Sequence, residues 1–276
     1  MGSLSDFAEN AFLKHLATEA AYTPAATVYL CLCTADPTDA ATGASMNEVA
    51  NSGSYARTAI TFGAAASRRV TQSGTVTFTA ASGSWGTVTH WAICTTNTYG
   101  SGNVLAAGSF ASSRSIVSGN TPSVASGEIW VEITASNGIS NYAANGFLDR
   151  MFRNQAFTVS ATYAALTTVI VTDSMTGSTI TEPSGNNYSR KQINTTGGAS
   201  PAWTAVTGTS PTTLTNNQIV TFATPSGSWG TIVYMAIVDA STTGNLLWYG
   251  DVTDQAVAAS DTVSFSATGG ITITMT

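Results

Sequence analysis

Hydrophobic residues near the start of the chain recur at the spacing of a helix. They are Leu4, Phe7, Ala8, Ala11 and Phe12. Because positions three and four residues apart share one helix face, this pattern predicts a helix over about residues 4–17. Ser3 would cap its first turn, with Asp6 and Glu9 near the positive end of the helix dipole. A second helix is predicted over about residues 140–153, where the same pattern returns.

Most of the remaining chain alternates between apolar and polar residues. Thr75–Thr79 and Ile271–Met275 both show the alternation of a half-buried strand. Clusters of turn-forming residues separate such runs, at 36–43, 96–103, 196–201 and 240–244. Many short strands at this spacing predict a mainly β protein made of antiparallel β-sandwiches, Ig-like or jelly-roll-like, with a barrel as the alternative.

The chain contains two copies of one segment. Residues 4–13 reappear as residues 139–148, an offset of 135. Tyr55-Ala56-Arg57 matches Tyr188-Ser189-Arg190, and the segment 82–88 returns at 226–232. Because several independent matches keep the same order, we predict two tandem domains, each a helix followed by a sandwich.

The predicted domains are residues 1–136 and 137–276. Between its Tyr-x-Arg and its Val-Thr-Phe, the second copy is longer by 11 residues, which places an insertion within 191–217. The insertion is rich in Thr, Gly, Asn and Pro. Such a loop is either a docking element or a tolerated surface insertion.

Charge is scarce throughout the chain. Only 9% of the 276 residues are charged, against roughly 25% in an ordinary soluble domain, and the net charge is −6. An acidic balance without basic clusters argues against a nucleic-acid partner. Neither a long apolar run nor a secretory signal is visible, so we expect no membrane association. Interface centres are depleted in Lys, Glu and Asp, so this surface is typical of a protein with permanent neighbours.

Residues for catalysis or metal binding are few. The three cysteines, Cys31, Cys33 and Cys94, give no complete disulfide framework and no second ligand pair for zinc, so we interpret them as buried, inert thiols. The two histidines, His15 and His90, supply little for acid–base chemistry. Glu128 and Glu132 are interpreted as solvated groups on a strand. We therefore expect no enzyme activity, no cofactor and no metal site.

Comparing the two copies separates structural residues from candidate contacts. Trp85 and Trp229 occupy the same position, as do Arg57 and Arg190, so we interpret all four as structural anchors. Trp130, Trp203 and Trp248 have no counterpart in the other copy and are our candidates for protein–protein contacts. Trp130 points away from Ile129 and Val131 in a strand, so we expect it to face outward, into a partner or against a loop.

Several segments resemble a family of tailed-bacteriophage virion proteins, often labelled putative tail fibre proteins. The resemblance rests on residues 4–10, 21–25, 55–57 and 84–88, and on Cys33-Thr34-Ala35-Asp36-Pro37-Thr38-Asp39 with Gly43. It covers essentially the whole chain, twice, although the second copy lacks the Thr-Ala-Asp-Pro-Thr-Asp signature. It implies no catalytic residues. It implies a virion location, which we expect to be the particle exterior after assembly in the host bacterial cytoplasm.

The leading hypothesis is a non-enzymatic accessory protein on the particle exterior, such as a capsid decoration or cement protein. The alternatives are a tail fibre or receptor-contact component, a carbohydrate-binding module, and a β-sandwich enzyme. The expected partners are major capsid or tail subunits, further copies of this chain, and a host surface glycan.

Overall fold

The computed structural model describes residues 2–134, 138–208 and 211–275 and shows a mainly β protein with two helices, as predicted. The helices are α1 (Asp6–Leu16) and α2 (Asn141–Arg153). The strands of the first copy are β1 (Gly2–Leu4), β2 (Val28–Cys33), β3 (Thr58–Ile60), β4 (Arg69–Thr71), β5 (Val76–Thr77), β6 (Gly86–Cys94), β7 (Val104–Ile116), β8 (Ser123–Val124) and β9 (Trp130–Glu132). Those of the second are β10 (Thr162–Thr167), β11 (Lys191–Ile193), β12 (Thr212–Thr215), β13 (Val220–Thr221), β14 (Gly230–Val238), β15 (Leu246–Val257), β16 (Ser264–Phe265) and β17 (Thr272–Met275).

Both helices begin later than the hydrophobic pattern predicts. Ser3 does not cap α1, because residues 2–4 are extended and pair with β7. The cap is Ser5, whose Oγ accepts the N–H of Ala8 at 3.3 Å. Ser140 does the same for Ala143 at 3.0 Å. Each serine also donates its hydroxyl to a strand carbonyl, so the cap ties the helix to the sheet of its own copy.

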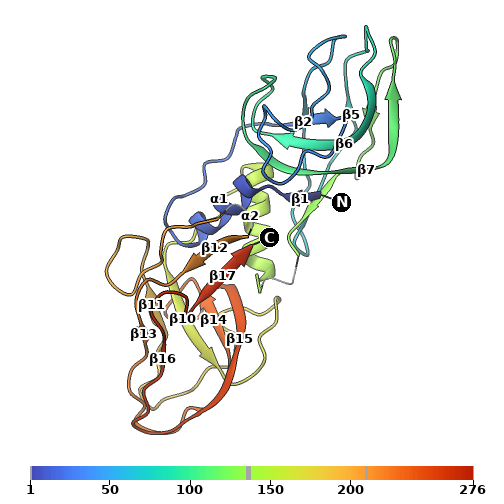
Figure 1. The fold of residues 1–276 in the computed structure, drawn as a ribbon. Coiled ribbons are helices and arrows are strands. Elements are labelled where there is room, and N and C mark those ends of the chain that lie inside the picture. The colour runs from blue at the N-terminus through green and yellow to red at the C-terminus, as the bar shows by residue number, and fades with distance from the viewer. Residues whose placement is uncertain (1, 135–137, 209–210, 276) are drawn as a thin grey trace. The chain divides into compact units, whose positions relative to one another are not determined.

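The first copy forms a seven-stranded sheet in the order β3-β2-β6-β7-β1-β9-β4. Figure 1 shows β6 and β7 curving together. The pairing is antiparallel except between β1 and β9, where Gly2 lies parallel to Val131. The sheet is otherwise antiparallel, as predicted, and the exception arises because the strand before α1 lies between β7 and β9. A separate pair, β5–β8, completes the copy.

The second copy repeats this pattern in three smaller sheets: β11-β10-β14-β15, β12–β17 and β13–β16. Its long hairpin β14–β15 has register shifts at 232/234 and 237/238, and β6–β7 has them at 88/90 and 93/94. Both shifts recur at the offset of 144, so the bulges that curl the hairpin are duplicated with the sequence. Strand β12 lies in the predicted insertion and pairs with β17.

By contacts, the chain divides into two compact units. The first unit comprises 1–10, 23–133 and 145–157, and the second comprises 11–22, 134–144 and 158–276. Within the first unit, Asp149 and Asn145 accept the N–H groups of Ala65 and Arg68, each at 2.8 Å. The boundary predicted between residues 136 and 137 lies outside the described residues. No helix in the described part of the chain is long and apolar enough to cross a membrane.

Candidate functional site

A buried arginine organises the loops of the first copy. The Arg57 guanidinium binds both carboxylate oxygens of Glu48, with its Nη2 2.8 Å from Oε2. It also donates to the carbonyls of Gly43, Thr96 and Ser101. Burial alone lowers the pKa of Arg57, but its hydrogen bonds with Glu48 more than offset this, so the pKa lies above its ordinary value. One side chain thus holds three carbonyls of two loops around a satisfied ion pair.

The second copy builds the same cluster. Arg190 binds both carboxylate oxygens of Glu182 and donates to the carbonyls of three loop residues, Gly177, Ala240 and Thr243. Each glutamate also accepts the hydroxyl of a tyrosine, the buried Tyr55 in the first copy and the partly buried Tyr188 in the second. Burial and the adjacent carboxylate raise the pKa of both tyrosines, so their hydroxyls stay protonated and act as structural donors.

The repeated tryptophans lie against these tyrosines. The rings of Tyr55 and Trp85 meet edge to face with centroids 5.2 Å apart, and Tyr188 and Trp229 do so at the same distance. The Trp85 indole N–H donates to the carbonyl of Gly53 at 2.8 Å, and that of Trp229 to the carbonyl of Asn186 at 2.9 Å. In both copies the tryptophan is buried and its polar atom is satisfied within the fold.

Of the three candidate contact tryptophans, Trp130 is the one with partial exposure. It sits in β9 between the buried Ile129 and Val131, in the outward orientation that the strand spacing predicts. The Arg69 guanidinium lies 3.8 Å from its ring centroid and pairs with Glu132. Glu132 is therefore ion-paired and not freely solvated. Glu128 pairs with Arg114 and precedes the strand, so the interpretation of both glutamates as solvated strand groups is wrong.

The other two candidates are buried within the second unit. Trp203 is 1% exposed, and its indole N–H donates to the Thr162 hydroxyl at 2.8 Å. Trp248 is 6% exposed, and its backbone pairs with that of Ile139 in an isolated antiparallel β-bridge. Their part in a contact between proteins stays a prediction. Ala106 stands at the position of Trp248 in the first copy and is also buried.

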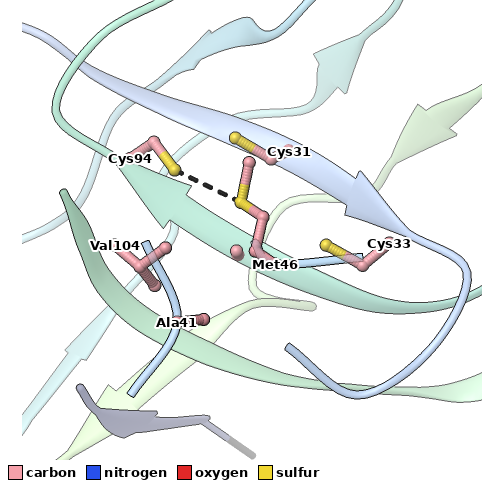
Figure 2. Close-up of a cluster of buried hydrophobic side chains, with 7 residues drawn as sticks. Cys31, Cys33, Ala41, Met46, Cys94 and Val104 are labelled. Atoms are coloured by element: carbon pink, nitrogen blue, oxygen red, sulfur yellow. Dashed lines mark hydrogen bonds between the residues drawn. The ribbon is translucent and has the colours of Figure 1, made fainter. Parts of the chain in front are cut away.

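The cysteines are free and buried, as predicted. Figure 2 shows Cys31, Cys33 and Cys94 around Met46, with the Cys94 sulfur 3.5 Å from the Met46 sulfur. Burial raises the pKa of the Cys31 and Cys33 thiols, which therefore pack as small apolar side chains. Among the described residues, no group of three or more His, Cys, Asp or Glu side chains is placed to hold a metal ion.

An acidic cluster at the start of α1 occurs in the first copy. Asp6 and Glu9 are buried, and each has one carboxylate oxygen without a hydrogen-bond partner. Burial, followed by the nearby charges of Asp39 and Asp6, raises the pKa of Glu9 to about 7. In the second copy, Asn141 and Ala144 take the places of Asp6 and Glu9. Glu9 is thus a group whose charge changes near neutral pH.

One comparison with known proteins decides the family. The model of a family described as "Podophage GP4 fiber I protein gp80" matches residues 3–132 and matches again over residues 138–274. The chain belongs to this family of phage fibre proteins. The double match confirms the tandem duplication and the resemblance to tailed-phage virion proteins. No curated protein matches the chain.

Membership of this family places the fibre protein in the virion. The family description names a fibre, so it supports the tail-fibre alternative better than the capsid decoration that we placed first. It also indicates a structural role, and the absence of enzyme activity stays an expectation.

The glycine of the family signature has a steric role. A Cβ on Gly43 would lie 1.9 Å from the carbonyl oxygen of Ser101, and one on Gly177 would lie 2.1 Å from that of Thr243. These are carbonyls that Arg57 and Arg190 bind. The glycine therefore lets two loops approach closely enough for one arginine to hold both.

Two equivalent pairs of polar residues in the fibre protein were not predicted from the sequence. Glu48 and Glu182 precede the repeated Tyr-x-Arg at nearly equal distances. Gln72 and Asn216 stand at the offset of 144, and each accepts the N–H of an isoleucine before the last strand, Ile129 or Ile271. Aligning the copies residue by residue, and not only by their longest matches, would have shown both pairs.

Proposed function

We propose that the chain is a non-enzymatic subunit of a tail fibre or a tail-associated fibre, held by lasting contacts with other virion subunits. The observation that carries this proposal is the match of a phage fibre family to both copies. The low content of charged residues supports it, because permanent interfaces exclude Lys, Glu and Asp from their centres. The buried arginine clusters support a structural role, because their polar groups are committed to the fold in both copies.

The loop after β2 and the equivalent loop after β10 differ in polarity, which suits different contacts. Ala35 and Asp36 in the first copy correspond to Val169 and Ile170 in the second. Ile170 is 63% exposed. The two copies therefore present a polar and an apolar surface on equivalent loops, so we expect the copies to contact different neighbours.

Trp130 is the residue that we propose as the centre of a contact in the first copy. Its ring is partly exposed beside the Arg69–Glu132 pair, and aromatic residues flanked by arginine are enriched at the centres of interfaces. Trp130→Ala should lower the amount of this chain in purified particles while leaving the isolated chain folded. Tyr99→Ala, at an aromatic residue of 40% exposure, is the matched control. Equal incorporation of the two variants would remove Trp130 from the contact.

Gold labelling of an epitope-tagged chain in intact particles tests the proposed location. We expect label at the tail. Label spread evenly over the head would instead support capsid decoration and contradict the proposal.

A further inference from the structure

A pocket of about 480 Å³ opens in the second copy. It lies between the second half of β15 and the segment 261–265. Buried apolar side chains, Leu166, Ile232 and Val257, line it. Gln255 and Asp261 are exposed residues of its lining. Its volume falls in the range of small-molecule sites, roughly 300–1,000 Å³.

The equivalent position in the first copy is occupied by an aromatic ring and an arginine side chain. Phe110 of β7 is 7% exposed, and the Arg114 guanidinium lies 4.5 Å from the centroid of its ring. Arg114 also donates to the carbonyl of Ser123 at 2.9 Å and pairs with Glu128. The aromatic ring and the arginine together bind β7 to the segment that follows it.

Strand registers show what replaces these residues. Trp91 faces Gly108 in the first copy and Met235 faces Gly250 in the second, so Val252 stands where Phe110 does. Gln255 lies opposite Ile232 as Arg114 lies opposite Val88, so Gln255 takes the place of Arg114. Gly270 precedes Ile271 as Glu128 precedes Ile129. The second copy has therefore lost the ring, the cation and its carboxylate partner together.

At one position the second copy has the larger side chain. Phe222 donates its N–H to the carbonyl of Val263 as Phe78 does to Pro122, so Phe265 corresponds to Val124. Val124 is 1% exposed, whereas Phe265 is only half-buried and lines the pocket. The second copy thus has an aromatic ring in the pocket wall, Phe265, and lacks the ring of Phe110 that occupies this position in the first copy.

The lining disfavours an anionic ligand and offers one apolar face and a polar edge. Phe265, Val252 and Val263 supply a half-buried apolar surface. Thr253, Gln255, Thr262 and Ser264 supply hydroxyl and amide groups. Asp261 is the only charged residue of the lining, and its Oδ2 accepts the N–H of Ala258 at 2.7 Å. A sugar ring has an apolar C–H face and hydroxyls around its edge, whereas an anionic ligand would meet a carboxylate and no cation.

We propose that this pocket binds a neutral sugar unit of a surface glycan. The proposal rests on the fibre role, which brings the chain into contact with surfaces outside the particle. The first copy, with Phe110 and Arg114 in place, does not bind sugar at the equivalent position.

Saturation-transfer NMR on the intact chain tests the pocket. The probes are glucose, galactose, mannose, rhamnose, N-acetylglucosamine and their short oligomers, with glucuronate as the anionic comparison. We expect transfer to at least one neutral sugar and none to glucuronate. Transfer to no neutral sugar, or to glucuronate alone, would overturn the proposal.

Two variants locate the signal. Val252→Phe introduces the residue of the first copy and should abolish transfer, whereas Val117→Phe makes the same change at an exposed valine outside the pocket and should preserve it. If Val252→Phe does not fold, Gln255→Arg at an exposed position replaces it, with the same expected loss. Transfer that survives in the folded pocket variant contradicts the site.

Particle incorporation separates this proposal from the fibre role. Val252→Phe should enter particles as the unaltered chain does, since the pocket takes no part in assembly. Normal incorporation without sugar binding by the unaltered chain rejects the pocket alone.

Discussion

The two copies keep the same arginine-centred polar cluster and differ at three other places. Both have an arginine bound to a glutamate, a tyrosine hydroxyl on that glutamate, and a tryptophan against the tyrosine. They differ in the acidic cluster at α1, in the loop containing Asp36 or Ile170, and at the position of Phe110 or Val252. The shared set holds the fold, and the differences are where each copy acquires its own role.

The difference also shows how a duplicated fold can be modified. A filled position in one copy can be a pocket in the other because the bulges of the supporting hairpin recur at the same positions of β6 and β14, although the first bulge holds one residue fewer in β15 than in β7.

The largest effect is expected from removing the buried arginine of the first copy. Arg57→Ala leaves the Glu48 carboxylate buried without its partner, so the free energy of unfolding should fall by about 3–5 kcal/mol in chemical denaturation. Arg190→Ala should cost less, because the Glu182 side chain is 18% exposed against 5% for Glu48.

Arg69→Ala is the control for this pair. The Arg69 side chain is 46% exposed, so its loss should cost about 1 kcal/mol or less. Equal losses for Arg57→Ala and Arg69→Ala would show that the buried cluster does not hold the loops.

A smaller effect is expected from the pH dependence of stability. The pKa of Glu9 is raised to about 7 in the folded protein, so the folded state holds a proton that the unfolded state releases near the ordinary value of 4.5. This contribution to stability is complete below pH 4.5 and is lost as the pH rises through 7. Its size is at most about 3 kcal/mol.

Thermal unfolding of the unaltered chain and of Glu9→Gln checks this prediction. The melting temperature of the unaltered chain should fall between pH 5 and pH 8 by more than that of the variant. Identical pH profiles would mean that Glu9 is ionised in the folded protein throughout this range.

The smallest effect on folding is expected at the apolar loop of the second copy. Ile170→Asp introduces the residue of the first copy at a position 63% exposed, so the free energy of unfolding should change by about 0.5 kcal/mol or less. Incorporation into particles should fall, because the apolar contact is lost. Ile219→Asp, at an exposed isoleucine outside this loop, is the control, and equal incorporation of the two variants would exclude the loop from the contact.

Much of the fold can be predicted from the sequence because its signals are local or repeated. The alternation in residues 271–275 and the helical spacing in 141–153 both mark real elements. The start of α1 was predicted two residues early, because pairing of Gly2–Leu4 with β7 is a long-range contact that hydrophobic spacing does not show. The parallel pairing of Gly2 with Val131 escaped prediction for the same reason.

The site residues also divide into those with a repeated sequence signal and those that depend on long-range contacts. Arg57 and Arg190 stand out because both copies keep them, but their partners Glu48 and Glu182 lie in segments that otherwise match poorly. Trp203 appears in the sequence as an unmatched aromatic in a polar insertion. The hydrogen bond of its indole to Thr162 depends on a partner 41 residues away, so its burial is visible in the structure alone.

The most direct test of the fibre assignment is the number of copies of this chain in purified particles, measured by quantitative mass spectrometry against the major capsid protein. A subunit of a fibre at the tail should be present in a few to tens of copies per particle. Hundreds of copies, in proportion to the capsid shell, would contradict the assignment and restore the decoration hypothesis.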